Sequence, residues 1–119
     1  MRIYWVSRHR PLPSQIRELE RLAGGQLEVV QDPNPFANAE EIKARFERNG
    51  CDDLVVVAPL SVFQRLVELG LRPLYAEMEK VPPEEAEVFA GGRGYRFRRF
   101  RRVRRLALEF EEHLELGKP

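Results

Sequence analysis

Cysteine and histidine are scarce in this chain of 119 residues, and their scarcity excludes several kinds of site. The single cysteine, Cys51, can neither form a disulfide within the chain nor supply the several thiolates of a structural zinc centre. The two histidines, His9 and His113, lie far apart in the sequence, so no histidine or cysteine pair has metal-ligand spacing. We therefore expect no metal and no other cofactor.

Long apolar runs are also missing. No stretch approaches the length needed to span a bilayer, and the N-terminal residues lack the apolar core of a signal peptide. A lone cysteine fits a reducing compartment. From these absences we expect a cytoplasmic protein without a membrane partner.

Three familiar motifs are absent as well. The segment "SRHRPLP" after the first apolar run contains no glycine, so the dinucleotide-binding fingerprint is missing. No Walker phosphate loop and no GxSxG nucleophile elbow occurs anywhere in the chain. A site in this protein must therefore be built from other residues.

The composition is that of a single globular domain covering residues 1–119. Hydrophobic residues make up 43% of the chain and charged residues 33%, while the formal net charge is only +1. The charge is distributed unevenly, because residues 93–105 contain eight arginines and no acid. Acidic residues lie on either side, in residues 77–87 and 109–115.

Short β-forming runs alternate with helical patterns over the first two thirds of the chain. We expect strands over residues 2–7, 26–31, 52–60 and 72–79, the first of them central, with one helix between each pair. This alternation predicts an α/β, Rossmann-like fold with a mostly parallel sheet and helices on both faces.

Three local signals mark the ends of the predicted helices. Gly24 and Gly25 end the first helix, which opens at Pro13. Asn38 caps the second, with Glu41 at the spacing of a capping box. Ser61 is expected to cap the third.

Residues 91–119 form an arginine-rich C-terminal extension that fits two structures. As a helix, it would place Phe97, Phe100, Val103, Ala107, Phe110 and Leu114 along one stripe. As a β-hairpin, it would place Tyr95 and Phe97 on one strand and Leu106, Leu108 and Phe110 on the next. Aromatic content favours strands at its start, and residues 106–116 have good helix propensity. The stripe would also suit a dimer interface.

Polar residues follow the predicted strands where a ligand is expected. In a doubly wound sheet, ligands bind outside the carboxyl ends of the strands, and helix N-termini there favour anions. Arginine recognises phosphate through its fork, and histidine transfers protons near neutral pH. The residues expected to converge at this edge are Ser7, Arg8, His9, Arg10, Asn34 and Ser61.

Each of these residues also has a purely structural interpretation. Ser7 can bond to backbone at the strand end, the arginines can be solvated, and Ser61 can simply cap a helix. The pair Asp52 and Asp53 reads as the polar start of a strand, at the wrong end for catalysis.

Residues 93–105 also leave two interpretations open. Arginines interleaved with aromatic residues can bind nucleic acid through phosphates and stacking. Alternatively, they form a strand or helix with one apolar face and with arginines in solvent, balanced by nearby glutamates. The acids of residues 109–115 would repel a polyanion.

Two stretches resemble a known family. "IYWVSRHRP" (residues 3–11) is similar to the N-terminal signature of small stand-alone CRISPR-associated ring nucleases, in which a strand runs into Ser-Arg-His-Pro. Residues 52–79 are similar to that family's central strand, turn, helix and strand. Arg10 stands where the family has proline, and the central turn "APLS" reverses the family's Leu-Pro order.

The resemblance implies a CARF-like domain that works as a homodimer and cleaves cyclic oligoadenylate, typically the four-membered ring. Such cleavage needs no metal and switches off type III CRISPR signalling. Ser7, Arg8 and His9 fall on the signature and would be catalytic, while Arg10, Asn34, Leu60 and Ser61 would bind the ligand.

Three functions therefore remain open. The first is a metal-independent phosphodiesterase, and the second is a sensor or sponge that binds the nucleotide without cleaving it. The third is an accessory protein that binds nucleic acid through residues 93–105.

Overall fold

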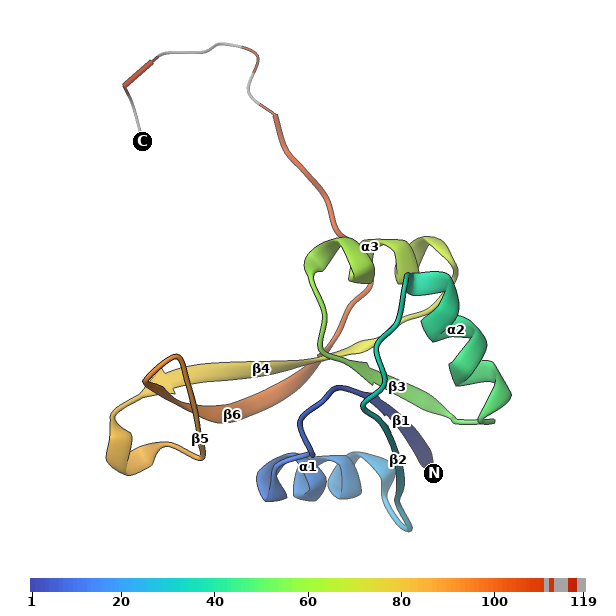
Figure 1. The fold of residues 1–119 in the computed structure, drawn as a ribbon, viewed down its shortest axis with the longest axis horizontal. Coiled ribbons are helices and arrows are strands. Elements are labelled where there is room, and N and C mark those ends of the chain that lie inside the picture. Colours follow the sequence, from blue (N-terminus) through green and yellow to red (C-terminus); the bar gives the residue numbers. More distant parts are fainter. Residues whose placement is uncertain (111, 113–115, 118–119) are drawn as a thin grey trace.

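The protein has a mixed α/β fold (Figure 1). Within residues 1–110, 112, 116 and 117, which the computed structural model describes, the chain forms six strands and three α-helices. The strands are β1 (Arg2–Val6), β2 (Glu28–Asp32), β3 (Asp53–Val56), β4 (Leu74–Val81), β5 (Val88–Ala90) and β6 (Arg93–Arg102). The helices are α1 (Pro13–Ala23), α2 (Ala39–Arg48) and α3 (Leu60–Glu68), with a short 3₁₀ turn η1 (Pro83–Glu85).

The six strands form one sheet in the order β2-β1-β3-β4-β6-β5. β1 pairs in parallel with β2 and β3, and β3 pairs in parallel with β4. β6 is antiparallel to both β4 and β5. The sheet is thus mixed, and the expectation of a mostly parallel sheet is only partly correct. The alternation with helices ends at β4, and without a crossover helix the next strands return antiparallel.

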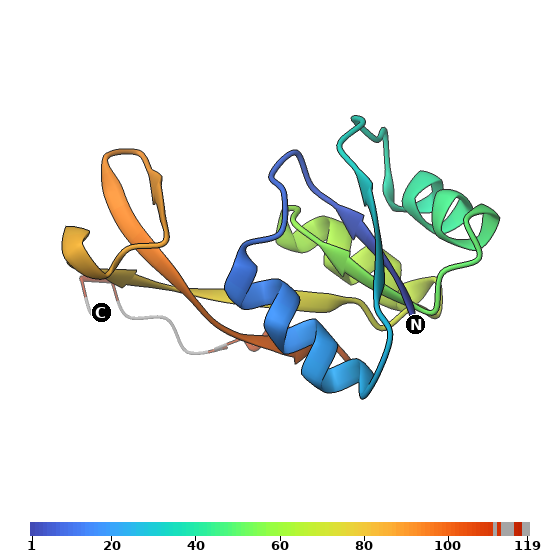
Figure 2. The same cartoon turned by 90° about the horizontal axis from the view of Figure 1, so that it is seen from below.

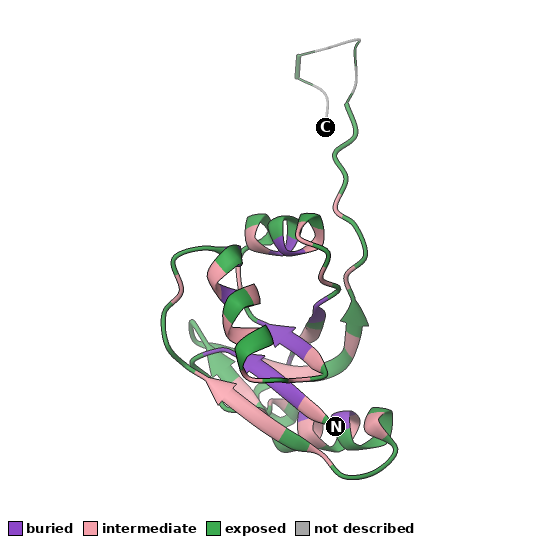
Figure 3. Cartoon of the chain, turned by 90° about the vertical axis from the view of Figure 1, so that its right-hand side faces the viewer, coloured by how far each residue is buried: buried purple, intermediate pink, exposed green. Residues whose placement is uncertain are grey.

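β1 is the central strand of the parallel part, as expected, because both of its faces are covered. Tyr4 and Val6 pack in the core beneath α2 and α3. Ile3 and Trp5 pack on the other face with Leu19 of α1. These four residues of β1 are at most 4% exposed. Figure 3 shows the buried residues concentrated on β1 and β3, between the helical layers.

The helix signals are confirmed for α1 and α2. α1 begins at Pro13 and ends before Gly24, whose φ of 66° is the left-handed conformation that glycine adopts at little cost. The Asn38 side chain accepts a hydrogen bond from the Glu41 N–H at 2.9 Å. The Glu41 carboxylate reaches back to the N–H of Ala37 at 2.7 Å, one residue before the cap.

The junction between β3 and α3 differs from the expectation. β3 ends at Val56 rather than running to residue 60, and α3 begins at Leu60. Pro59 occupies the N-cap position, so Ser61 lies inside the first turn and is not the predicted cap. Proline has no N–H for a sheet ladder, and its fixed φ suits the start of a helix.

The arginine-rich segment is a strand, β6, as the aromatic content indicated. The predicted hairpin partner is wrong, because β6 pairs with β4 and β5 and residues 103–110 have no regular secondary structure. Val103 and Leu106 instead pack against the core beneath α2 and α3. The part of the predicted C-terminal helix at residues 111 and 113–115, with Leu114 of the stripe, lies outside the described residues.

A β-bulge keeps the phenylalanines of β6 on one face of the sheet. Met78 pairs with Phe97 and Ala76 with Phe100, so β6 has one more residue than β4 between these pairs. The extra residue, Arg98, restores the alternation that the three-residue spacing would break. The two phenylalanine rings lie 4.8 Å apart.

The outer parts of β4 and β6, together with β5, form an arm that leaves the main body (Figure 2). Residues 103–110 also lead away from the body, beside α3 (Figure 1). The overall extents are accordingly 54 × 40 × 27 Å. Among the described residues, the helices are all too short or too polar to cross a membrane.

Packing at the far end of the arm, where Gly94 of β6 lies between Val81 of β4 and Phe89 of β5, generates a prediction. A Cβ on Gly94 would lie 2.7 Å from the Ala86 Cβ and 3.2 Å from the Val81 carbonyl oxygen. Gly94→Ala should lower the free energy of unfolding by about 1–3 kcal/mol, because the arm would be overpacked. Gly25 has open space around it, so Gly25→Ala should change stability by less than about 0.5 kcal/mol. Urea denaturation of both variants measures the difference, and equal stabilities would contradict the prediction.

Candidate functional site

A cavity of about 360 Å³ opens where the carboxyl ends of β1 and β2 meet. We call it the edge cavity. Its walls are the loops after β1 and β2, with one residue from the loop after β3. The lining residues are Val6, Ser7, Arg8, His9, Asp32, Pro33, Asn34, Pro35, Phe36 and Val57. The structure therefore brings together four of the predicted site residues, Ser7, Arg8, His9 and Asn34.

Two hydrogen bonds fix the turn that presents Arg8. The Ser7 hydroxyl oxygen accepts from the backbone N–H of His9 at 3.1 Å. The indole N–H of Trp5 donates to the carbonyl oxygen of His9 at 2.9 Å. Ser7 thus has the structural role foreseen for it, bonding to backbone at the strand end. Among the described residues its O–H has no acceptor, so it can still donate to a ligand.

Arg8 supplies positive charge to the edge cavity. Its side chain is exposed, and no carboxylate of the described residues pairs with it. Arg10 is likewise exposed and has no acidic partner within the described part, but it lines a neighbouring cavity instead. An unpaired guanidinium that lines a cavity is suited to an anion.

Leu60 and Ser61 do not line the edge cavity. Both lie in the first turn of α3, and Leu60 is 68% exposed. Their part in ligand binding stays a prediction.

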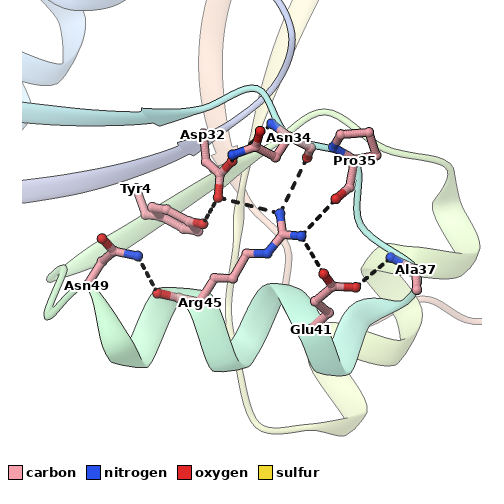
Figure 4. A network of polar contacts seen from close by, with 8 residues as sticks. All are labelled: Tyr4, Asp32, Asn34, Pro35, Ala37, Glu41, Arg45 and Asn49. Atoms are coloured by element: carbon pink, nitrogen blue, oxygen red, sulfur yellow. Dashed lines mark hydrogen bonds and ion pairs between the residues drawn. The ribbon is translucent and has the colours of Figure 1, made fainter.

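A polar network missed by the sequence analysis supports one wall of the edge cavity (Figure 4). Asp32 at the end of β2 accepts hydrogen bonds from the Tyr4 hydroxyl and from both the backbone and side-chain N–H groups of Asn34. The Arg45 guanidinium lies 3.5 Å from Asp32 and donates to the Pro35 carbonyl at 2.8 Å. The network thereby fixes the loop that carries Asn34.

The network holds Asp32 in its charged form. Burial would raise the pKa of Asp32, but the hydrogen bonds from Tyr4 and Asn34 and the charge of Arg45 outweigh burial and lower it. Burial and the bond to Asp32 raise the pKa of Tyr4 well above its usual value. Arg45 also pairs with Glu41, so two carboxylates share its charge. The charge of Asp32, which lines the edge cavity, is therefore only partly offset by Arg45, which does not line it.

A second cavity of about 390 Å³ adjoins the first and shares Ser7, His9 and Val57 with it. We call it the arm cavity, because residues of β4, β5 and β6 supply much of its wall. Arg10 lies in its lining. Most of the remaining lining residues are apolar.

The arginines of β6 are largely paired with acids. Five of the eight arginines in residues 93–105 form ion pairs. The closest N–O distances range from 2.6 to 3.8 Å. Arg96 and Arg98 pair with Glu79, Arg99 and Arg101 with Glu77, and Arg102 with Asp53. β6 thus agrees with the alternative in which the arginines of residues 93–105 lie in solvent and are balanced by nearby acids.

The acidic and thiol groups near the start of β3 have structural surroundings. The Arg102 guanidinium bonds both carboxylate oxygens of Asp53 at 2.7 Å. Asp52 accepts from the backbone N–H of Arg2 at 2.7 Å. Burial raises the pKa of the Cys51 thiol, which disfavours the reactive thiolate. Within the described part of the chain, no three acidic, histidine or cysteine residues are placed to hold a metal.

Comparisons of the chain with protein families, with curated proteins and with solved structures found no match.

The network predicts a pH-dependent effect of Asp32→Asn. At pH 7 the variant should lose about 1–2 kcal/mol of unfolding free energy, because Tyr4 and Arg45 lose a charged acceptor. Since the folded pKa of Asp32 lies below its unfolded value, its stabilisation is present above about pH 4 and is lost as the pH falls through the folded pKa. The gap between parent and variant should therefore close towards acid pH.

Urea denaturation at pH 7, 5, 4 and 3 measures this gap. Glu20→Gln is the matched control, because Glu20 is exposed and forms no ion pair within the described residues. It should show no gap at any of these pH values. A gap for Asp32→Asn that stays constant with pH would contradict the assigned role of the carboxylate.

Proposed function

We propose that the protein binds cyclic oligoadenylate at the edge cavity and cleaves it without a metal, acting in the cytoplasm as a Rossmann-like, CARF-like ring nuclease. One observation carries the proposal: Ser7, Arg8 and His9, the residues of the Ser-Arg-His signature, line a single cavity with Asn34. The parallel strand order β2-β1-β3-β4 supports it, because such sheets bind ligands where the strand order reverses, here between β1 and β3. The edge cavity reaches this point through Ser7, His9 and Val57, which follow these two strands.

The residues of the turn can divide the chemistry among them. A ribose 2′-oxygen attacks the adjacent phosphorus, the bond to the 5′-oxygen breaks, and a 2′,3′-cyclic phosphate forms. His9 accepts the 2′-hydroxyl proton, and the leaving 5′-oxygen takes up a proton from water or from a protonated side chain. The Arg8 guanidinium and the Ser7 O–H stabilise the charge on the phosphoryl oxygens.

The volume of the edge cavity limits how much of a cyclic oligoadenylate could bind in it. Small-molecule cavities usually measure about 300–1,000 Å³. At about 360 Å³, the edge cavity has room for one phosphodiester with its ribose but not for a ring of four nucleotides. We propose that the rest of the ring lies on a second copy of the chain, related by a twofold axis. The protein would then act as a homodimer.

The other two functions remain as alternatives. A sponge would use the same cavity without turnover, so only a cleavage assay separates it from the enzyme. Binding of nucleic acid through residues 93–105 is less favoured, because five of the eight arginines there already pair with acids. That alternative requires affinity for DNA or RNA that falls steeply with salt.

The test is incubation of the purified protein with cyclic tri-, tetra- and hexa-adenylate in EDTA, followed by chromatography with mass detection. We expect linear products that carry a 2′,3′-cyclic phosphate. Arg8→Ala should slow cleavage about 10- to 100-fold, because a charge-assisted contact to phosphate is lost. Arg17→Ala is the control, since Arg17 is an exposed arginine on α1 that lines neither cavity, and its rate should match the parent.

The outcomes separate the alternatives. Intact rings that co-elute with the protein would indicate a sponge or sensor and contradict the enzyme. Intact rings without binding would contradict both, and the nucleic-acid alternative would then be tested by salt titration.

A further inference from the structure

The arm cavity exists because β3 and β4 separate. They share a single register pair, Val55 with Leu74. Beyond that pair β4 turns away with β6 and β5, and the space between the arm and the ends of β1 and β3 is the cavity. Its walls contain five aromatic side chains, those of Trp5, Phe63, Tyr75, Phe89 and Tyr95. Phe89 and Tyr75 are 60% and 44% exposed, so apolar rings face open space.

Two buried polar residues, Ser7 and Gln15, line this largely apolar cavity. Gln15 of α1 is only 5% exposed. Its Oε1 accepts from the backbone N–H of Leu12 at 2.8 Å. A backbone N–H can only donate, so this bond fixes which end of the amide faces Leu12.

The other end of the Gln15 amide is poorly satisfied. Among the described residues, the partner of Nε2 is the thioether sulfur of Met78 at 3.8 Å. A thioether is a weak acceptor, whereas a buried amide donor without a good partner costs free energy. The cavity therefore combines aromatic walls with an under-used N–H donor. A purely aliphatic occupant would leave that donor unmet.

We infer that the arm cavity binds a flat heteroaromatic ring of the purine class, with the Gln15 amide donating to a ring nitrogen. Aromatic side chains stack on the faces of such rings, and a hydrogen bond to a ring acceptor adds selectivity. A cavity of about 390 Å³ accommodates a bicyclic base with room to spare.

The position of the arm cavity connects it with the edge cavity. Ser7, His9 and Val57 line both, so a base in one cavity can be joined through its ribose to a phosphate in the other. That connection rests on the proposed function. Binding of the heteroaromatic ring does not rest on it, because the inference follows from the arm cavity alone.

The test uses free purine and indole, a bicycle of the same size without a ring acceptor. Trp5 is the single tryptophan and lines the arm cavity, so its indole N–H gives one NMR signal that reports on occupancy. We expect purine to shift this signal and to bind about tenfold more tightly than indole, as one hydrogen bond permits. Equal affinities for the two bicycles, or an unmoved Trp5 signal, would overturn the inference.

Two variants sharpen the test. Gln15→Met keeps the side chain's length but removes the donor, so purine binding should weaken about tenfold while indole binding does not. Phe89→Ala removes an exposed stacking ring and should weaken both bicycles about five- to tenfold, which keeps the inference testable if the first variant does not fold. Leu22→Ala is the control, since Leu22 is an exposed apolar residue of α1 outside the cavity. Undiminished purine binding by a folded Gln15→Met, or by Phe89→Ala, would count against the assigned contacts.

A parallel titration with cyclic tetra-adenylate separates this inference from the proposed function. Purine bound at Trp5 without any binding of the cyclic nucleotide would refute the proposed function and leave the inference standing. Cyclic nucleotide bound in an Arg8-dependent manner, with purine unbound and Trp5 unmoved, would refute the inference alone.

Discussion

The burial of β1 on both faces is the constraint on which the rest of the structure depends. Ile3 and Trp5 are covered by α1, and Tyr4 and Val6 by α2 and α3, so neither face can turn to solvent. Such a strand must lie inside a sheet with helices on both sides. Its neighbours are β2 and β3, whose carboxyl ends point to the same edge. The polar segment that follows β1 is therefore held in the middle of that edge, and both cavities open beside it.

In the arm, the charged residues of β4 and β6 pair with one another across the strands. Glu77 lies directly opposite Arg99, and Glu79 lies opposite Arg96. Exposed ion pairs of this kind contribute little to stability, because water screens them. They do favour one register, since opposite charges attract across neighbouring strands and like charges repel. The arginine-rich sequence is thus explained by strand pairing, and its charge is mostly used within the chain.

Strands β1 to β4, the three helices and the central place of β1 could be predicted because their signals are local, whereas β5 lies in a segment expected to be a loop. Periodic apolar residues, the glycine after α1 and the Asn38 cap each act over a few positions. The polar network could not be predicted in this way, since Tyr4 and Asp32 are 28 residues apart and meet only through strand pairing. A weak sequence signal was present in Asp32-Pro-Asn34, a turn-forming pattern. The prediction of a C-terminal hairpin was wrong because β6 pairs with β4 and β5, with Phe100 packed against Trp5, while residues 103–110 have no regular secondary structure.

The two cavities differ in character because loops form most of the edge cavity, whereas the strands of the arm form much of the arm cavity. The loop after β1 supplies the edge cavity with a serine and an arginine, and the end of β2 supplies a carboxylate that pairs with Arg45. The diverging arm supplies the other cavity with aromatic rings, to which α1 adds the single amide of Gln15. The bond from Trp5 to the His9 carbonyl ties the wall of one cavity to the turn of the other. The two cavities therefore share Ser7, His9 and Val57, while the rest of the arm cavity's wall depends on the position of the arm. The proposed binding of a flat ring would thus depend on the arm, whereas presentation of Arg8 depends on the turn after β1.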